Sequence, residues 1–353
     1  MRGAERTFSA IASCWPEAPI YTLLYDQGNT AGCFDQHPVK TSYLQRLPVR
    51  QRGFRALLPL YPGAVERFQM SEHSLVISSS SAFAHGVRAP QGAAHVCYCH
   101  TPFRYVWHER NRALEEFPPT LRPLGRRLLN RLRAWDREAA QRVDAYIANS
   151  EATRARIRRF WGRDARIVHP PVETHRFRVS SPEDYFLVVT ELVAHKRVDR
   201  ALAAAERAGK RVKVVGEGPE LRRLRSQFGD HAEFLGRVDD PHLASLYARS
   251  LALIVPNIEE FGIAAVEAEA AGRPVVGPKR GGTKETVVDG VTGVLVPPED
   301  DDALAEALRY VDFQRFSPDA SRRQASRFSK DAFRTRLLAE VHRIAGPRAV
   351  ARA

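Results

Sequence analysis

The stretch 258–274, IEEFGIAAVEAEAAGRP, predicts a helix that begins near Gly262 and stops before Pro274. Its small residues allow close packing on a sheet, and Gly262 lets a ligand approach the first free amides. Because a helix N-terminus carries free N–H groups and a partial positive charge, it attracts anions. The preceding carboxylates of Glu259 and Glu260 therefore either cap the helix or leave its N-terminus to a phosphate.

Short apolar runs rich in β-branched residues alternate with helical stretches along the rest of the chain. They are 74–78, 94–99, 144–150 and 165–171 in the first half, and 185–190, 211–218, 232–237, 250–256, 274–277 and 293–298 in the second. This alternation is typical of parallel sheets covered on both faces. The sequence thus predicts an α/β fold of two doubly wound domains, with ligands at the carboxyl ends of the strands.

The break between the two series lies in residues 169–184, which are rich in Pro and Ser and have no periodicity. We therefore expect one domain in residues 1–172 and a second in residues 173–328. The amphipathic segment that follows predicts a C-terminal helix, so residues 329–353 are expected to pack back on the first domain.

The net charge of +13 comes almost entirely from arginine, because only seven residues are lysine. Residues 104–166 hold sixteen arginines and eight acidic residues. Such an excess suits nucleic acid, an anionic membrane surface or phosphorylated substrates, although a GC-rich genome also favours arginine. The segment 121–142 places Leu121, Leu124, Leu128, Leu132 and Trp135 near helical spacing among arginines. It predicts either a helix lying on a membrane or a solvated helix packing its apolar stripe on the sheet.

The cysteines and the hydropathy pattern narrow the class of protein. Four cysteines do not form a disulfide framework, and Cys97 and Cys99 are expected to share one face of a buried strand rather than bind a metal. The sequence contains neither a hydrophobic leader at its start nor an apolar run of the roughly 20 residues that cross a bilayer. We expect a cytoplasmic protein, with peripheral contact at the inner membrane face left open.

The segment 258–274 resembles a motif of a known enzyme family. Glu259, seven residues and Glu267, with Phe261 and Gly262 between, resemble the E-x7-E motif of retaining family 4 glycosyltransferases. These enzymes have the GT-B fold, two Rossmann-like domains facing across a cleft. The resemblance implies that Glu259 accepts hydrogen bonds from the donor sugar and Glu267 from the ribose of the nucleotide. It also implies that the amides of Phe261, Gly262 and Ile263 lie beside the sugar and phosphate.

Two glycine pairs extend the resemblance through the second domain. Gly216 and Gly218, in VVGEGPELRRL, are implied to form a tight turn near the nucleotide base. Gly281 and Gly282, in PKRGGTKETVVDGVTGVLVPPED, are implied to turn close to the sugar. Ordinary turn chemistry is the alternative explanation for both pairs.

The segment TELVAHKRVD corresponds to the part of the family that grips the donor diphosphate with an arginine and a lysine. Lys196 matches the lysine, whereas Glu191 stands at the arginine position. A carboxylate there would repel the diphosphate. Either Arg197 turns toward the phosphates instead, or Glu191 faces away.

In the first domain, CHTPFRYVWH resembles a segment of bacterial polysaccharide-assembly mannosyltransferases. His100 is implied to touch the donor sugar and the incoming acceptor, and a structural histidine is the alternative. Arg104 is a candidate ligand for an acceptor phosphate, and an ordinary surface arginine is the alternative.

Family members begin with a β-strand, a Gly-rich loop and a helix, whereas this chain begins with MRGAER, inside the corresponding loop. The first strand is therefore expected to be missing, through a misassigned start or a truncated copy with impaired activity. Loss of that central strand would leave an apolar slot and unpaired backbone groups. Gly3 is still implied to approach the diphosphate.

The implied activity is retaining, metal-independent transfer of a hexose, with no cofactor and no D-x-D metal cluster. GDP-mannose is the favoured donor and a UDP-hexose the second. The acceptor is a lipid-linked or soluble saccharide in cell-surface polysaccharide biosynthesis. A sugar-nucleotide epimerase of the same fold, an inactive paralogue, and a nucleic-acid or membrane binder are the rivals. We expect no nucleic-acid partner, since a binder leaves the E-x7-E segment unexplained.

Overall fold

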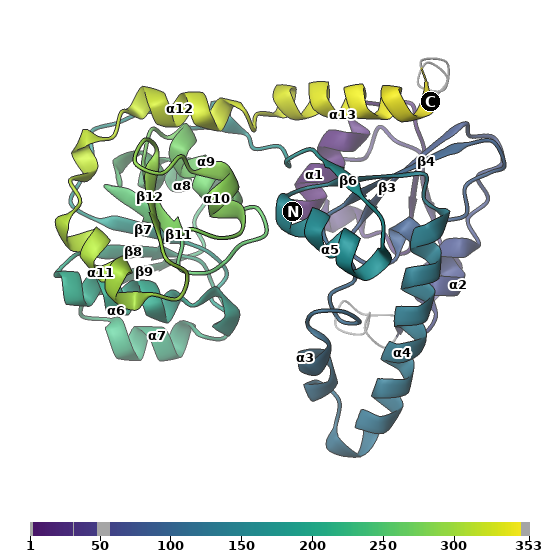
Figure 1. Cartoon of the computed structure of the whole chain (residues 1–353), viewed down its shortest axis with the longest axis horizontal. Helices are drawn as coiled ribbons and strands as arrows, with labels where there is room; N and C mark the ends of the chain where they lie inside the picture. The colour runs from purple at the N-terminus through teal and green to yellow at the C-terminus, as the bar shows by residue number, and fades with distance from the viewer. Residues whose placement is uncertain (1–2, 31, 48–56, 347–353) are drawn as a thin grey trace. The chain divides into compact units, whose positions relative to one another are not determined.

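A computed structural model describes residues 3–30, 32–47 and 57–346 of the chain. It divides the chain into two compact units (Figure 1). Unit 1 consists of residues 1–169 and 334–353, and unit 2 of residues 170–333. The described strands of both units pair in parallel and helices pack against them, which confirms the predicted α/β class.

Unit 2, all of whose residues are described, contains a six-stranded parallel sheet in the order β12-β11-β10-β7-β8-β9. Its strands are β7 (Phe186–Val189), β8 (Val212–Val215), β9 (Ala232–Gly236), β10 (Ala252–Ile254), β11 (Val275–Pro278) and β12 (Gly293–Val296). Its longer helices are α6 (Val198–Ala208), α7 (Leu221–Phe228), α8 (Asp240–Arg249), α9 (Ile263–Ala270), α11 (Asp301–Tyr310) and α12 (Pro318–Ser326). The short α10 (Gly282–Thr286) follows β11.

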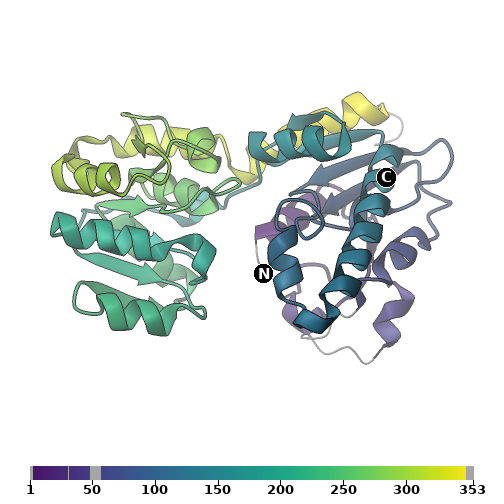
Figure 2. The same cartoon turned by 60° about the horizontal axis from the view of Figure 1, so that its bottom comes forward.

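Helices cover both faces of this sheet (Figure 2). Phe186 and Val188 of β7 pack into one core with α6, α7 and α11. Leu187 packs into a second core with α8, α9 and the end of α12. Alternate residues of one strand are thus buried on opposite faces, as the continuous apolar runs predicted.

The strand order of unit 2 fixes where a ligand can bind. From β7 the chain proceeds to β8 and β9 on one side, then crosses to β10, β11 and β12 on the other. The order therefore reverses between β7 and β10. Open α/β sheets bind ligands outside the carboxyl ends of the strands at such a switch point. The segments that leave these ends, 190–197 and 255–262, are the positions to search.

Unit 1 is built on a four-stranded parallel sheet, β3-β4-β5-β6, within its described part. The strands are β3 (Leu75–Ser80), β4 (Ala94–Cys99), β5 (Ala145–Ala148) and β6 (Ala165–Ile167). The helices of unit 1 are α1 (Gly3–Ala12), α2 (Tyr61–Glu66), α3 (Arg110–Glu115), α4 (Arg122–Ala139) and α5 (Glu151–Trp161). The C-terminal helix α13 (Lys330–Ala345) belongs to unit 1 from Arg334 onward and buries Leu337 and Val341 there.

Every apolar run that the sequence assigned to a strand contains or overlaps one, but unit 1 also holds two strands that were not predicted. These are β1 (Ile20–Thr22) and β2 (Val39–Thr41), which pair in parallel as a separate two-stranded sheet. A cavity of about 620 Å³ lies beside β1 and β3. The expected apolar slot is therefore present within the described part of unit 1.

The apolar stripe predicted for residues 121–142 packs only in part. Leu129 and Leu132 are buried, whereas Leu121 and Leu124 are 49% and 65% exposed. Of the rest of the expected stripe, Leu132 is buried, and Leu128 and Trp135 are partly buried against the same core, so only its first two leucines fail to pack. The prediction that the leading leucines pack on the sheet was wrong.

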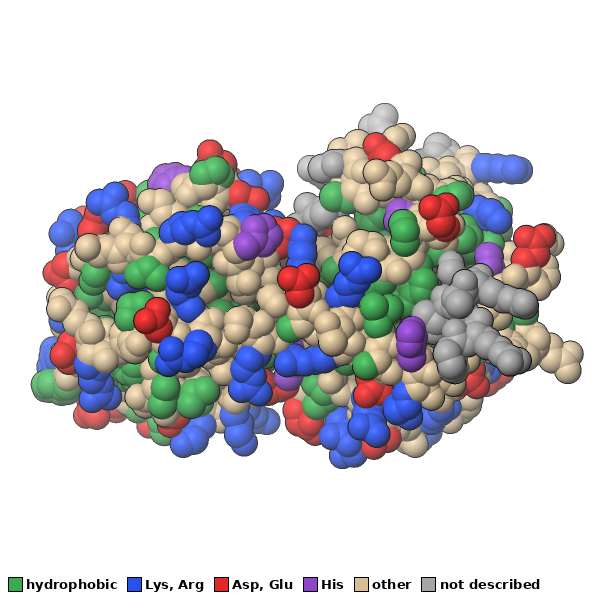
Figure 3. Space-filling model, turned by 90° about the horizontal axis from the view of Figure 1, so that it is seen from above, with side chains coloured by type: hydrophobic (Ala, Val, Ile, Leu, Met, Phe, Trp, Pro, Cys, Tyr) green, Lys and Arg blue, Asp and Glu red, His purple; other side chains and the backbone are tan. Residues whose placement is uncertain are grey.

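Basic side chains are dispersed among acidic ones over the face that Figure 3 shows, rather than gathered into a single stripe. Within the described ranges, none of the helices combines the length and apolar composition needed to cross a membrane. Contact with a membrane surface through the arginine-rich segment stays a prediction.

Candidate functional site

Two of the predicted site residues meet at the switch point of unit 2. Lys196 follows β7 and Glu259 follows β10, and Lys196 Nζ donates a hydrogen bond to Glu259 Oε1 at 2.6 Å. The side chains are 22% and 23% exposed, so the pair is accessible from solvent. The fold brings together a cation and a carboxylate that lie 63 residues apart in sequence.

The N-terminus of α9 lies directly after Glu259 in the chain. Gly262 is the N-cap residue, with φ of 83°, and no side chain caps the helix through it. Because Glu259 pairs with Lys196, capping alone does not account for this carboxylate. With glycine at the N-cap position, the partial positive charge at the start of α9 is accessible to an anion.

Glu267 lies on α9, about one turn further along, and is 9% exposed. The hydroxyl of Tyr247, on α8, donates to Glu267 Oε2 at 2.9 Å. Burial, with the nearby Glu267 carboxylate as the second cause, raises the pKa of Tyr247 well above its ordinary value. Tyr247 thus stays protonated and fixes one oxygen of Glu267. The sequence held no signal for this partner, because the contact arises only where α8 packs on α9.

Gly281 and Gly282 pack against the backbone that carries Glu259. A Cβ on Gly282 would lie 2.0 Å from the carbonyl oxygen of Phe261, and one on Gly281 would lie 2.4 Å from that of Glu259. The Gly282 amide also donates to the Glu259 carbonyl oxygen at 2.8 Å. Only glycine fits at these positions, so the pair holds the Glu259 loop in place.

Gly216 and Gly218 do the same for the loop that carries Lys196. A Cβ on Gly216 would lie 1.8 Å from the carbonyl oxygen of Thr190, and one on Gly218 would lie 2.2 Å from that of Leu192. This close approach accounts for both glycines without a ligand. Their expected proximity to a nucleotide base stays a prediction.

The backbone of Arg197 has φ of 50°, which is uncommon for a residue other than glycine and marks local strain. Its side chain is 47% exposed, and its Nε lies 3.5 Å from Asp199 Oδ1. Glu191 is exposed at the start of the same loop. The structure therefore pairs Arg197 with its own helix, and a turn toward phosphates stays a prediction.

His100 follows β4 in unit 1, and its Nε2 forms a 2.9 Å hydrogen bond with Ser79 Oγ on β3. Its backbone carbonyl accepts a hydrogen bond from the Thr153 hydroxyl. Burial lowers the pKa of His100 to about 4, so its imidazole is neutral near pH 7. His100 also lines the cavity of unit 1. The neutral imidazole can donate or accept a hydrogen bond toward a ligand. The sequence contained no indication of the hydrogen bond between Ser79 and His100.

The remaining predicted residues of unit 1 have simpler surroundings. Arg104 is 44% exposed, with Nη1 3.6 Å from Glu109 Oε1. Gly3 begins α1, and its carbonyl accepts from the Thr7 hydroxyl. Neither contact tests the implied role in binding phosphate.

Cys97 and Cys99 form no disulfide, are buried and pack into one cluster, which confirms that they share a face of β4. No group of three or more His, Cys, Asp or Glu side chains within the described residues could hold a metal ion. Metal independence of the implied reaction remains a prediction.

Two Rossmann-like α/β units in one chain constitute the GT-B fold. The solved structure of Anabaena HepE in complex with UDP matches with a TM-score of 0.70 over 97% of this chain and 96% of that one. The identity is 18%, so this likeness concerns the fold.

Two family models together span residues 1–325. Residues 1–176 match the model described as Glycosyltransferase Family 4, and residues 172–325 match Glycosyl transferases group 1. The chain belongs to glycosyltransferase family 4.

Curated relatives match over shorter regions. Phosphatidyl-myo-inositol mannosyltransferase of Mycobacterium leprae is 45% identical over 100 residues, which cover 27% of this chain and 26% of the relative. GDP-mannose-dependent alpha-(1-6)-phosphatidylinositol monomannoside mannosyltransferase of Mycolicibacterium smegmatis is 31% identical over 199 residues, covering 47% and 52%. The chain thus spans about a quarter to a half of the length of these two relatives.

Proposed function

We propose that the chain transfers a hexose from a nucleoside diphosphate sugar to an acceptor hydroxyl, with retention of configuration at the sugar. The Lys196–Glu259 pair at the switch point of unit 2 carries this proposal. It places a cation for phosphate and a carboxylate for hydroxyl groups next to the uncapped start of α9. Family membership supports the same assignment.

The ion pair suggests how the donor enters. The donor diphosphate replaces Glu259 as the partner of Lys196, since a charge-assisted bond to phosphate is of comparable strength. The amides of Phe261, Gly262 and Ile263 at the start of α9 complete the anion site. Glu259 is then released to accept hydrogen bonds from the sugar, and Glu267, oriented by Tyr247, accepts from the ribose.

The chemical step is a substitution at the anomeric carbon of the donor. The bond from this carbon to the diphosphate oxygen breaks, and a bond to the acceptor oxygen forms on the same face. The departing diphosphate takes the proton of the acceptor hydroxyl, and Lys196 with the α9 amides stabilises the charge that develops on it. Glu259 binds the sugar and is not a nucleophile in this proposal. Neutral His100 hydrogen-bonds to the sugar and the incoming acceptor.

GDP-mannose is the proposed donor, with a UDP-hexose as the second candidate. Both mycobacterial relatives are mannosyltransferases by name, which supports mannose as the transferred sugar. The acceptor is proposed to be a lipid-linked saccharide in cell-surface polysaccharide biosynthesis, and the excess of arginine in residues 104–166 suits its phosphate.

The test is an assay of the full chain with GDP-mannose or a UDP-hexose and a polyprenyl-diphosphate-linked saccharide, with and without EDTA. We expect release of nucleoside diphosphate coupled to a product whose glycosidic bond keeps the donor's anomeric configuration, at a rate that EDTA does not change. Inversion, or loss of turnover in EDTA, would contradict the mechanism. Release of nucleotide with an epimerised free sugar and no acceptor would instead identify the rival epimerase.

A further inference from the structure

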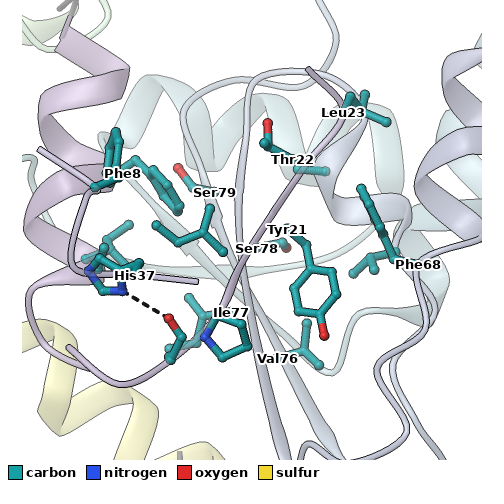
Figure 4. A pocket seen from close by; sticks show the side chains of 18 of the residues that line it. Phe8, Tyr21, Thr22, Leu23, His37, Phe68, Val76, Ile77, Ser78 and Ser79 are labelled. Carbon is teal, nitrogen blue, oxygen red and sulfur yellow. Dashed lines mark hydrogen bonds between the residues drawn. The ribbon is translucent and has the colours of Figure 1, made fainter. Parts of the chain in front are cut away.

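His100 is held in place by contacts with three segments of unit 1. Its Nε2 forms a 2.9 Å hydrogen bond with Ser79 Oγ, and its backbone N–H donates to the Ser80 carbonyl oxygen at 2.8 Å. Its own carbonyl oxygen accepts from the hydroxyl of Thr153, on α5, at 2.9 Å. Ser79 belongs to the residues that line the cavity of unit 1 (Figure 4). The position of His100 therefore depends on the end of β3, on α5, and on the loop after β4 that His100 begins.

The same three segments meet at one buried side chain of α4, Asp136. Its Oδ2 accepts from the indole N–H of Trp107 and from that of Trp161, each at 2.7 Å. Trp107 lies in the loop after β4, and Trp161 ends α5. The third contact is with His85, in the 3₁₀ turn (Ala84–Gly86) that follows β3. His85 Nε2 lies 3.5 Å from Asp136 Oδ1 and 3.4 Å from the Asp136 carbonyl oxygen.

His85 connects Asp136 to the end of β3. Its Nδ1 lies 3.2 Å from Ser80 Oγ, and its backbone N–H donates to the same oxygen at 3.4 Å. Burial lowers the pKa of His85, so the imidazole is neutral near pH 7. Because a backbone carbonyl can only accept, the proton of the ring lies on Nε2, and Nδ1 accepts from the Ser80 hydroxyl. The chain from Asp136 through His85 thus reaches Ser80, whose carbonyl oxygen holds the backbone of His100.

Stability alone is a weak explanation for a carboxylate at this position. Asp136 Oδ1 is buried without a hydrogen-bond partner in the described part of the chain, apart from its 3.5 Å contact with His85. An apolar side chain of similar volume would avoid the cost of burying this polar group. The other buried residues of α4 are nonpolar: Gly125, Leu129, Leu132 and Ala139. What the carboxylate provides is a set of directional hydrogen bonds, which hold the surrounding segments in one arrangement.

We propose that Asp136 is a positioning residue for His100. Its contacts with Trp107, Trp161 and His85 fix the loop after β4, the end of α5 and the end of β3 relative to one another. Because Asp136 is buried, it acts through these contacts and does not touch the substrate. The inference rests on the proposed function, in which the His100 imidazole hydrogen-bonds to the sugar and the incoming acceptor.

Three variants of the full chain test this role. Asp136→Asn keeps the shape of the side chain but places N–H groups where a carboxylate oxygen accepted. Trp107→Phe removes one of the three contacts and keeps an aromatic ring in the loop. Asp144→Asn is the matched control, because Asp144 Oδ2 accepts from the His95 amide near the start of β4, at the opposite end of that strand from His100.

Turnover is measured at saturating donor and acceptor, at a temperature at which each variant is folded. Circular dichroism checks the fold, and tryptophan fluorescence reports unit 1 because all four tryptophans of the sequence lie in it. We expect Asp136→Asn to lower kcat about a hundredfold and Trp107→Phe about tenfold, because a displacement of about 1 Å at the reacting groups has effects of this size. The Kd for nucleoside diphosphate should not change, because Lys196 and the start of α9 lie in unit 2. Asp144→Asn should keep the turnover of the unmodified chain.

A folded Asp136→Asn protein with unchanged kcat, or an equal loss in Asp144→Asn, would overturn the proposal. If Asp136→Asn does not fold, Trp107→Phe decides the test, and an unchanged kcat in that variant would overturn the proposal in the same way.

A second measurement separates this inference from the proposed function. Nitrogen-15 NMR of labelled histidine reports the His100 ring nitrogens in the protein without substrate. We expect the Nε2 signal, which senses the bond to Ser79, to shift in Asp136→Asn and Trp107→Phe but not in Asp144→Asn. If the unmodified chain transfers no sugar but this pattern is seen, the proposed function fails and the coupling of Asp136 to His100 stands. An unchanged signal in the first two variants would overturn the coupling, whatever the activity.

Discussion

The two units use the same strand–helix alternation but differ in how completely their sheets are assembled. Unit 2 has one continuous six-stranded sheet with buried residues on both faces. In unit 1 the described strands form two separate sheets, and a cavity lies beside the facing edges of β1 and β3. The candidate residues of unit 2 stand on loops held by a finished sheet, whereas His100 of unit 1 stands next to an unfilled space.

This difference separates two requirements of the proposed activity. Donor binding depends on the loops of unit 2, whose backbones are fixed by glycines in close contact. The surroundings of His100 depend on a sheet edge that lacks a partner among the described residues. Changes in unit 2 should therefore affect donor binding directly, and changes in unit 1 should affect its stability first.

The largest effect is expected from the ion pair in unit 2. Glu259→Gln or Lys196→Ala should lower turnover by about two to four orders of magnitude while the fold survives, because each removes a preorganised contact to the reacting groups. Steady-state assays of the full chain measure this, with circular dichroism as the check on folding. Glu260→Gln, the same change one residue along, is the matched control and should stay near wild type. Near-normal turnover in both site variants would remove the assigned roles.

The second largest effect is expected from adding a side chain at Gly282, where the backbone packs against the Glu259 loop. Gly282→Ala should destabilise unit 2 by about 3 kcal/mol and weaken nucleotide binding more than tenfold, because the added Cβ overlaps the Phe261 carbonyl. Denaturant unfolding and nucleotide titration measure the two effects. Gly63→Ala is the control: its Cβ would meet nothing within 4 Å, and alanine favours the helix α2 that contains it. Equal behaviour of the two variants would show that the loop is not held by close packing.

The stability of the two units should respond differently to a fall in pH. Burial lowers the pKa values of His95 and His100 to about 4, from an ordinary 6.5. Between these values the unfolded chain binds protons that unit 1 does not, so their stabilising contribution is complete above pH 6.5 and is lost as pH falls toward 4. At pH 5 each histidine should lower the free energy of unfolding of unit 1 by about 2 kcal/mol relative to its value above pH 6.5, since one pKa unit corresponds to about 1.4 kcal/mol. Burial raises the pKa of Asp136, and the protonation of this residue as the pH falls offsets part of the lost stability.

Unit 2 should respond with the opposite sign. Burial raises the pKa of Glu269, so its contribution is complete below its ordinary pKa of 4.5 and is lost as pH rises. Denaturant unfolding followed by tryptophan fluorescence reports unit 1, and hydrogen exchange in β7 and β8 reports unit 2. A fluorescence midpoint that does not change between pH 6.5 and 4.5 would contradict the assignment to buried histidines.

The smallest effect is expected at the partner of Glu267. Tyr247→Phe should weaken nucleotide binding about tenfold, because a hydrogen bond to a charged group contributes about 1.5–3 kcal/mol and Glu267 keeps its other contacts. Tyr185→Phe removes a hydroxyl that bonds the Leu246 carbonyl in the same unit, and it should lower stability without changing affinity. Equal nucleotide affinities in the two variants would show that Tyr247 does not position Glu267.

Much of the fold could be predicted because strand and helix periods are local. Most strand residues of unit 2 are apolar and pack on one of the two faces of the sheet, so the strands appear as apolar runs in the sequence, and the start of α9 follows from Gly262. Strands β1 and β2, of three residues each, lie outside the runs that the sequence assigned to strands, although the equally short β6 and β10 lie inside them. The slot beside β1 was predicted from the family pattern, not from periodicity.

Only those site residues that match a motif of the family could be predicted from the sequence. Glu259 and Lys196 were identified by the family pattern, but their contact required the strand order to bring two loops together. Tyr247 and Ser79 could not be found, since each reaches its partner through packing across about 20 residues of sequence.

The most direct test of the central claim, that unit 2 binds a nucleoside diphosphate through Lys196 at its switch point, is a calorimetric titration. The full chain and its Lys196→Ala variant are each titrated with GDP, UDP and ADP, with and without EDTA. We expect selective binding of one nucleotide, with an affinity that EDTA does not change and that is at least tenfold weaker in the variant. Absence of binding to the unmodified chain, or equal affinity in the variant, would contradict the claim.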